Sequence, residues 1–177
     1  MTERANATEA YRQRLVAFAP RVYGLLVRLV GHRETAEDLT QETLLRAFRG
    51  LRTYRPEGKF RAWLFRIATN AARDWLRRQP REPALGLEME RDAWPRGKGE
   101  NHLPPESSLV RSERAAAVED ALARLPEPDR QVLLLRFYGE LAFKEVAKVT
   151  GEPLGTVLAR AHRALKKLAD LMPEGEP

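Results

Sequence analysis

The sequence predicts an all-α protein, with two small helical domains joined by a flexible linker. Apolar residues recur at helical spacing through most of the 177 residues, and the alternation typical of a half-buried strand is nearly absent. Residues 80–108 contain five prolines and three glycines and show no apolar period, which is typical of a linker. The predicted units are therefore a first domain over 8–79, this linker, and a second domain over 109–172.

The first domain begins with two expected helices. Thr8 is a suitable N-cap for a helix that runs to about Ala19. Pro20 fits the first turn of a second helix, which Gly31 can end as the residue after the C-cap. We therefore expect a break in the chain near Pro20.

Two further helices complete the first domain. The helix expected over 33–51 has acidic first turns and a basic end, as the helix dipole favours. A turn follows over 52–59, and the next helix spans 60–78 and ends before Pro80. At helical spacing its core face consists of Phe60, Leu64, Ile67, Ala68, Ala71 and Trp75.

The helix over 60–78 also carries a polar face suited to nucleic acid. This face consists of Arg66, Asn70, Arg73 and Arg77. From Lys59 to Arg81 there are seven Lys or Arg residues and one acid, Asp74. Four aromatic residues are interleaved with this charge: Phe60, Trp63, Phe65 and Trp75. Cations bind phosphates and aromatic rings stack on unpaired bases, so we favour single-stranded nucleic acid as a ligand over an ordinary solvated face.

The second domain has the pattern of a helix-turn-helix. Helices are expected over 110–125 and 128–139, then a short helix over 143–149, a tight turn at Gly151, and a long helix from 154 onward. The residues of the last helix that can pack are Leu154, Val157, Ala161, Ala164, Leu165 and Leu168. Those that can face DNA are Thr156, Arg160, Arg163, Lys166 and Lys167. The alternative is a helical hairpin that binds nothing.

The composition favours an anionic partner and excludes several classes of site. The formal net charge is +6 and the pI is about 10. The chain has no cysteine, which excludes disulfides and cysteine zinc sites and fits a reducing cytosol. No apolar run reaches the roughly 20 residues of a membrane span, and the N-terminus does not look like a signal peptide. We expect a cytoplasmic protein with no membrane insertion.

Enzymatic chemistry is not expected. The three histidines, at 32, 102 and 162, have no metal-ligand spacing. The sequence contains neither a phosphate-binding glycine loop nor a nucleophile elbow. We therefore expect no catalytic residue, no metal and no cofactor.

Three segments, in this order, resemble the extracytoplasmic-function (ECF) sigma factors of bacterial RNA polymerase. They are AEDLTQETLLRAFRGL (36–51), FRAWLFRIATNAARDWLRR (60–78) and LPEPDRQVLLLRFYGELAFKEVAKVTGEPLGTVLARAHRALKKL (125–168). The resemblance implies an alternative sigma factor that brings core polymerase to specific promoters and melts them. It also implies that the linker passes through the polymerase, and that an anti-sigma factor is a further partner.

The resemblance assigns the helix over 33–51 to core-polymerase binding. The matching residues are Glu37, Asp38, Gln41, Glu42 and Arg46. Exposed carboxylates and amides can pair with arginines of a partner helix. An ordinary solvated face would explain the same charges.

The resemblance assigns residues 59–78 to the minus-ten element, held as a separated non-template strand. The matching residues are Lys59, Arg61, Trp63, Arg66, Asn70, Arg73 and Arg77. The cations would hold phosphates and Asn70 would bind a base edge, which helps to offset the few kcal/mol that base extrusion costs. Trp63 is a wedge or stacking surface, or equally a core residue, and Trp75 is expected in the core.

The resemblance assigns the helix-turn-helix to the minus-thirty-five element in the major groove. The matching positions are Gly155, Thr156, Leu158, Ala159, Arg160, Arg163 and Lys166. Leu158 and Ala159 stand where the family commonly has a basic residue and a serine, and Ala142 lacks the usual hydroxyl cap. This module is then expected to depend on phosphate contacts and helix-start N–H groups, or on Leu158 touching thymine methyls.

Two other classes of protein remain open. One is a duplex-DNA regulator that uses only the helix-turn-helix, with the N-terminal half as a dimerisation or effector domain. It would bind duplex DNA tightly without polymerase. The other is a protein-interaction module whose basic faces bind an acidic partner, and it would support no transcription.

Overall fold

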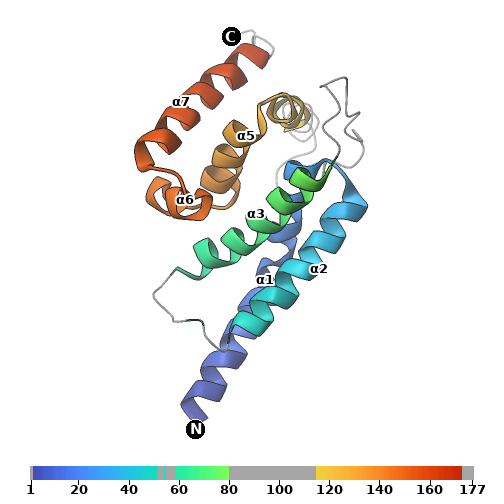
Figure 1. The fold of residues 1–177 in the computed structure, drawn as a ribbon, viewed down its shortest axis with the longest axis vertical. Helices are drawn as coiled ribbons and strands as arrows, with labels where there is room; N and C mark the ends of the chain where they lie inside the picture. The colour runs from blue at the N-terminus through green and yellow to red at the C-terminus, as the bar shows by residue number, and fades with distance from the viewer. Residues whose placement is uncertain (1, 52–53, 55–58, 80–114, 173–177) are drawn as a thin grey trace, which may run out of the picture.

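The computed structural model describes residues 2–51, 54, 59–79 and 115–172, and in these ranges the fold is all-helical. Three helices form the first module: α1 (Thr2–Val30), α2 (Arg33–Gly50) and α3 (Phe60–Arg78). The second module contains a helical stretch at 115–123, α5 (Glu127–Leu133), the π-helix η1 (Leu134–Tyr138), α6 (Phe143–Thr150) and α7 (Leu154–Leu171). No strand occurs in these ranges, so the predicted all-α class is confirmed (Figure 1). The predicted linker lies outside the described residues.

The break expected near Pro20 is wrong, because α1 continues through this proline. The proline removes the hydrogen bond to the carbonyl of Val16, and Val16 is 74% exposed, so water can reach this turn. Packing holds both halves of the helix in line. Leu15 is buried before the proline, the ring of Phe18 lies 6.0 Å from that of Phe60, and Val22 is fully buried after the proline.

The turns at the helix ends follow the predicted glycines. Gly31 has a φ of 79° at the end of α1, and Gly151 has a φ of 75° between α6 and α7. Both lie in the left-handed region, which glycine enters without the steric cost of a Cβ. The turn at Gly151 gives α6 and α7 the helix-turn-helix arrangement that the sequence predicts.

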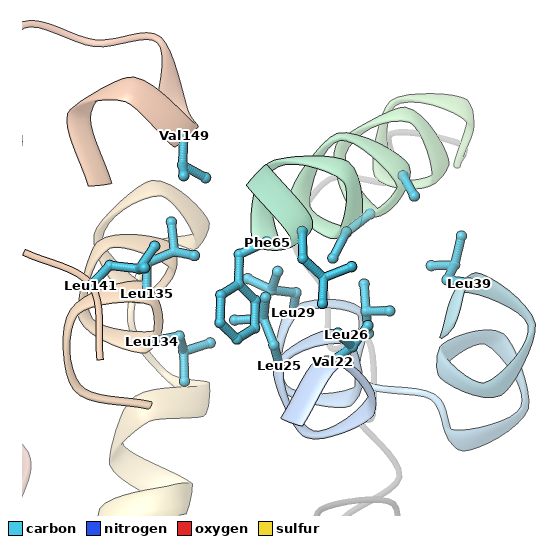
Figure 2. Close-up of a cluster of buried hydrophobic side chains, with 14 of the residues drawn as sticks. Val22, Leu25, Leu26, Leu29, Leu39, Phe65, Leu134, Leu135, Leu141 and Val149 are labelled. Atoms are coloured by element: carbon cyan, nitrogen blue, oxygen red, sulfur yellow. The ribbon is translucent and has the colours of Figure 1, made fainter. Parts of the chain in front are cut away.

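The two modules share one hydrophobic core. From Gly24 to Val30 every residue of α1 is buried, which is expected of a helix covered on more than one side. Figure 2 shows Phe65 of α3 between Leu25 and Leu29 of α1 and the second module's Leu134, Leu135 and Leu141. The second module therefore packs directly on α1 and α3.

The helix α3 is buried on two faces, not on the single face expected from its sequence. The expected core residues Phe60, Leu64, Ala68 and Ala71 are buried. A second buried row contains Phe65, Thr69 and Ala72 at spacings of four and three residues. Thr69 donates its hydroxyl to the carbonyl of Phe65 at 2.8 Å, so this polar side chain is satisfied inside the interface.

Candidate nucleic-acid interface

The polar row of α3 lies on the surface. Arg66, Asn70, Arg73 and Arg77 are all exposed, at the spacing the sequence predicts for one face. Arg77 also pairs with Asp74 at 3.2 Å, one turn earlier on the same helix. The result is a row of cations with one carboxamide among them, open to a negatively charged ligand.

The two cations at the start of α3 differ from this row. Lys59 is exposed at the N-cap position. Arg61 is half-buried and donates to the Glu140 carboxylate of the second module at 2.8 Å. The structure therefore places Arg61 in an ion pair between the modules, and a phosphate would have to replace Glu140.

The aromatic residues of α3 are mostly structural. Phe60 is buried, as its place on the expected core face predicts, and Phe65 is buried as well. Packing against α1 and the second module covers the two rings, so neither offers a stacking surface in this conformation. Trp63 is partly buried and packs on Tyr54, with ring centroids 4.6 Å apart, and on Phe60 at 5.7 Å. Its remaining exposed edge is compatible with either role expected for it.

Trp75 packs against the core of the first module, as expected. Its ring meets His32 edge-on, with centroids 6.2 Å apart. His32 is the N-cap residue of α2. The contact therefore ties the end of α3 to the α1–α2 turn and leaves Trp75 outside the exposed polar row.

The outer face of α2 is polar with an apolar border. All five residues predicted to bind polymerase are exposed: Glu37, Asp38, Gln41, Glu42 and Arg46. Arg46 donates to Glu42 at 2.6 Å. Sequence reasoning missed Leu45 and Phe48, which are 56% and 45% exposed beside this face. Both residues lie outside the buried stripe of α2, and this position in the helical pattern could have predicted their exposure.

The start of α7 is open to solvent. Gly155, Thr156, Leu158 and Ala159 are exposed, and the space beside the Gly155 Cα is empty to 4 Å. Further along, Arg163 and Lys166 are also exposed. These positions lie on one side of α7, opposite its buried Val157, Ala161 and Ala164. Such a surface can approach a DNA groove.

Arg160 is held within the second module. It donates to Glu152 at 2.7 Å and lies 3.8 Å from the Asp129 carboxylate, and its side chain is 23% exposed. Asp129 also lies 3.9 Å from Arg163. Two acids therefore partly neutralise the cations at the middle of α7, an arrangement the helical pattern of α7 alone did not reveal.

The start of α6 is capped without a hydroxyl. Ala142 is the N-cap residue and makes no side-chain cap hydrogen bond, as the sequence indicates. Its backbone N–H instead donates to the Glu145 carboxylate at 2.9 Å. Half of a capping box therefore remains.

An apolar cavity of about 410 Å³ lies where the 115–123 helix, η1 and α7 meet α1. Leu165, expected to pack, lines this cavity and is 44% exposed. Leu165 therefore packs only in part, and Phe137, which lines the same cavity, is also exposed, at 59%.

Two further kinds of feature are absent from the described residues. None of the helices in these ranges is both long and apolar enough to cross a bilayer. Within the same ranges no three His, Asp or Glu side chains gather in a way that could hold a metal ion.

Both modules match families of known proteins. Residues 15–82 match the family model for sigma-70 region 2, and residues 115–168 match that for sigma-70 region 4. The chain is 35% identical over 173 residues to CarQ of Myxococcus xanthus, an RNA polymerase sigma factor, covering 98% of this chain and 95% of CarQ. It is 33% identical over 154 residues to the RNA polymerase sigma-H factor of Pseudomonas aeruginosa, covering 85% and 79%.

The ECF sigma factor SigE of Mycolicibacterium smegmatis is 38% identical over 154 residues, covering 87% of this chain. The chain spans 58% of the length of SigE. Among solved structures, the sigma factor RpoE of Bartonella quintana in complex with the anti-sigma factor NepR has the same fold. The TM-score is 0.70 at 24% identity, covering 92% of this chain and 96% of RpoE.

CnrH, solved in complex with the cytosolic domain of CnrY, gives a TM-score of 0.61 at 25% identity and covers 96% and 92% of the two chains. Both halves of the chain thus match sigma-70 regions, in the order of the relatives. The chain belongs to the ECF sigma factors of the sigma-70 family.

Proposed function

We propose that this chain is an alternative sigma factor that directs bacterial core RNA polymerase to specific promoters and opens them. The observation that carries the proposal is the exposed row of Arg66, Asn70, Arg73 and Arg77 on α3. It lies in the region 2 match, and the exposed start of α7 lies in the region 4 match. One chain thus presents two surfaces suited to DNA.

The division of labour follows the modules. Residues 8–79 bind core polymerase and the minus-ten element, residues 80–108 link the two modules, and residues 109–172 bind the minus-thirty-five element. The exposed carboxylates and amide of α2, together with Leu45 and Phe48, form the polymerase surface. An apolar patch beside charged residues is the usual composition of a protein interface.

The minus-ten contact has two parts. The α3 cations hold the phosphates of the non-template strand, and Asn70 reads the edge of an unpaired base, because a carboxamide supplies both a donor and an acceptor. Lys59 and Trp63 border the start of this surface. The chain carries out no catalytic step of its own.

The minus-thirty-five contact depends on phosphates more than on bases. The start of α7 presents Gly155, Leu158 and Ala159, which have no hydrogen-bonding side chain, and Thr156, which has one hydroxyl. Backbone N–H groups at the helix start and the exposed Arg163 and Lys166 supply the positive potential. Leu158 is suited to contact a thymine methyl group.

An anti-sigma factor is a further partner, acting in the cytoplasm. The solved relatives RpoE and CnrH are seen with NepR and with the cytosolic domain of CnrY. The similarity of fold supports a protein regulator for this chain too.

Transcription in vitro tests the proposal. Upstream fragments of the source genome are transcribed by core polymerase with and without the protein, and permanganate maps unpaired thymines. Start sites that require the protein, with reactive thymines upstream, support a sigma factor. Tight duplex binding by the protein alone, without polymerase binding, would instead identify a free-standing helix-turn-helix regulator. No polymerase binding and no transcript would contradict both the proposal and a role in initiation.

A further inference from the structure

Arg160 is less exposed than its neighbours on α7. It follows Thr156 by four residues and precedes Arg163 by three, so the three side chains are neighbours on the helix surface. Thr156 and Arg163 are exposed, whereas the Arg160 side chain is only 23% exposed. The acids around Arg160 explain this difference.

The first of these acids is Glu152, in the turn between α6 and α7. Arg160 donates through Nη2 to the Glu152 carboxylate at 2.7 Å. The backbone of Glu152 is restrained on both sides. Its N–H donates to the carbonyl of Ala147 at 3.2 Å, and the next residue is Pro153, whose ring restricts φ. The carboxylate therefore starts from a restrained backbone, and the arginine side chain lies against it.

The second acid, Asp129, faces the same guanidinium from α5. Its buried carboxylate lies 3.8 Å from Nη1 of Arg160, which is too long for a hydrogen bond. The Nε of Arg160 is buried and has no hydrogen-bond partner in the part of the chain that the structure describes. Neither acid thus makes the two-point contact by which arginine binds a carboxylate most strongly. Arg160 is held in place, but part of its hydrogen-bonding capacity is unused.

The restrained guanidinium is the group by which arginine reads guanine. Two of its N–H donors can bind guanine O6 and N7, which is the commonest specific contact in the major groove. Residues in the first half of a recognition helix make such contacts, and Arg160 lies in the first half of α7. The Glu152 carboxylate and a guanine edge would therefore compete for the same donors.

The charge of Glu152 also favours the paired state when DNA is near. If Arg160 moved to a base, the carboxylate would be left unpaired beside the exposed Gly155 and Thr156, where α7 opens toward DNA. Phosphates repel an unpaired carboxylate at such a position. Arg163 lies 3.9 Å from Asp129 and keeps a 58% exposed side chain, so the restraint acts mainly on Arg160.

We propose that Glu152 is a positioning residue that determines base preference in the minus-thirty-five element. It holds Arg160 against the second module and thereby prevents this arginine from reading a guanine. Recognition of the upstream element then depends on phosphates and on Leu158. The effect on promoter choice rests on the proposed function, whereas the pairing of Glu152 with Arg160 concerns the helix-turn-helix alone.

Selection from randomised DNA tests the proposal. The full chain, assembled with core polymerase, binds duplexes that carry a minus-ten segment and a randomised upstream element, and the bound duplexes are sequenced. Glu152→Ala removes both the acceptor and the charge. It is expected to produce a new guanine preference of about tenfold at one base pair, where the native chain shows less than about twofold. Glu152→Gln keeps one acceptor oxygen without the charge and should produce a smaller preference.

Two control variants make the result specific. Combining Glu152→Ala with Arg160→Ala should abolish the new guanine preference, because the reading side chain is gone. Asp170→Ala removes a carboxylate from an exposed position at the other end of α7, and it should leave the selected sequences unchanged. Circular dichroism verifies that each variant is folded at the selection temperature. Affinity that rises equally for all sequences, or a guanine preference that persists without Arg160, would overturn the proposal.

The same selection with the full chain alone, at low salt, separates the role of Glu152 from the proposed function. A new guanine preference of Glu152→Ala without polymerase, in a chain that supports no transcription, would support the role of Glu152 and contradict the proposed function. Identical preferences of the native and Glu152→Ala chains, with and without polymerase, would contradict the role of Glu152 alone. An absence of duplex binding by every variant would contradict both.

Discussion

The hydroxyl of Tyr138 lies where a side chain at Gly24 would begin. A Cβ built on Gly24 of α1 would stand 2.0 Å from Tyr138 Oη and 2.7 Å from its Cζ. Gly24 lies inside a helix, where glycine costs about 0.5–1 kcal/mol relative to alanine. The glycine thus lets an aromatic ring of the second module approach the backbone of α1, at the expense of helix stability.

Gly24→Ala should therefore destabilise the chain although alanine is the better helix former. The methyl group forces the Tyr138 ring out of its position against Arg28, whose guanidinium carbon lies 4.6 Å from the ring centroid. In a Tyr138→Ala background the same substitution should destabilise much less, because only Arg28 Nη1, 3.1 Å from the added Cβ, still crowds the methyl group. Thermal unfolding of the four proteins measures the cost of Gly24→Ala in each background. Destabilisation of equal size in both backgrounds would show that the close approach is not the cause.

Glu119→Ala should cost about 3 kcal/mol or more. It removes the Glu119 carboxylate that Arg28 binds at 2.7 Å, and the Arg28 side chain is only 7% exposed. The adjacent Asp120 pairs with Arg124 at an exposed position, so Asp120→Ala should cost at most about 1 kcal/mol. Chemical denaturation measures the loss in the free energy of unfolding for each of the two variants. Equal losses would mean that the buried pair does not hold the modules together.

Asn70→Ala should lower open-complex formation about tenfold, the size of one lost base-edge contact. Affinity for core polymerase should change little, because Asn70 lies on α3 and the proposed polymerase surface lies on α2. Permanganate reactivity and a polymerase-binding assay separate the two steps. Asn70→Asp keeps the shape but replaces the amide donor by a negatively charged acceptor, so it should impair opening at least as much as Asn70→Ala. A similar loss in both assays would contradict the assignment.

Phe48→Ala should weaken core-polymerase binding by about tenfold, because an exposed aromatic ring at an interface is a common source of binding energy. Glu42→Lys should impair the same step and leave strand opening from preformed holoenzyme nearly intact. Val16→Ala, at a position 74% exposed on α1, is the matched control and should bind normally. Normal binding by Phe48→Ala would move the polymerase surface away from this end of α2.

Arg160→Ala and Lys166→Ala should affect different properties of the protein, folding stability in the first case and DNA binding alone in the second. Lys166 is exposed, so its loss should reduce the salt dependence of promoter binding by about one phosphate contact and leave folding unchanged. Arg160 stabilises Glu152 and the buried Asp129, so its loss should also lower the melting temperature. Salt titrations and calorimetry give the two readouts. A normal melting temperature for Arg160→Ala would show that its ion pairs are not structural.

The local elements could be predicted from the sequence because their signals are local. The polar row of α3 and the turn at Gly151 depend on helical spacing and on one glycine φ angle. The continuous helix through Pro20 could not be predicted, because tertiary packing on both sides of the proline overrides its local tendency to interrupt a helix. The burial of Phe65 also escaped prediction, since its partners Leu134, Leu135 and Leu141 lie about 70 positions later in the chain.

The candidate site divides in the same way. Exposure of the predicted α2 and α7 residues follows from periodicity, and the structure places them accordingly. The engagement of Arg61 by Glu140 and of Arg160 by Glu152 could not be foreseen. These contacts depend on loops that bring acids onto helices distant in sequence or across a turn. Charge patterns alone do not say which cations are already neutralised.

Phe65 is an interior residue only while the second module covers it. Parting the modules bares this ring, together with Leu134, Leu135 and Leu141 on the opposing surface. A population held apart without polymerase would therefore be less soluble, and it would self-associate as its concentration rises. Overproduction of a permanently separated variant should consequently yield inclusion bodies where the native sequence stays in solution.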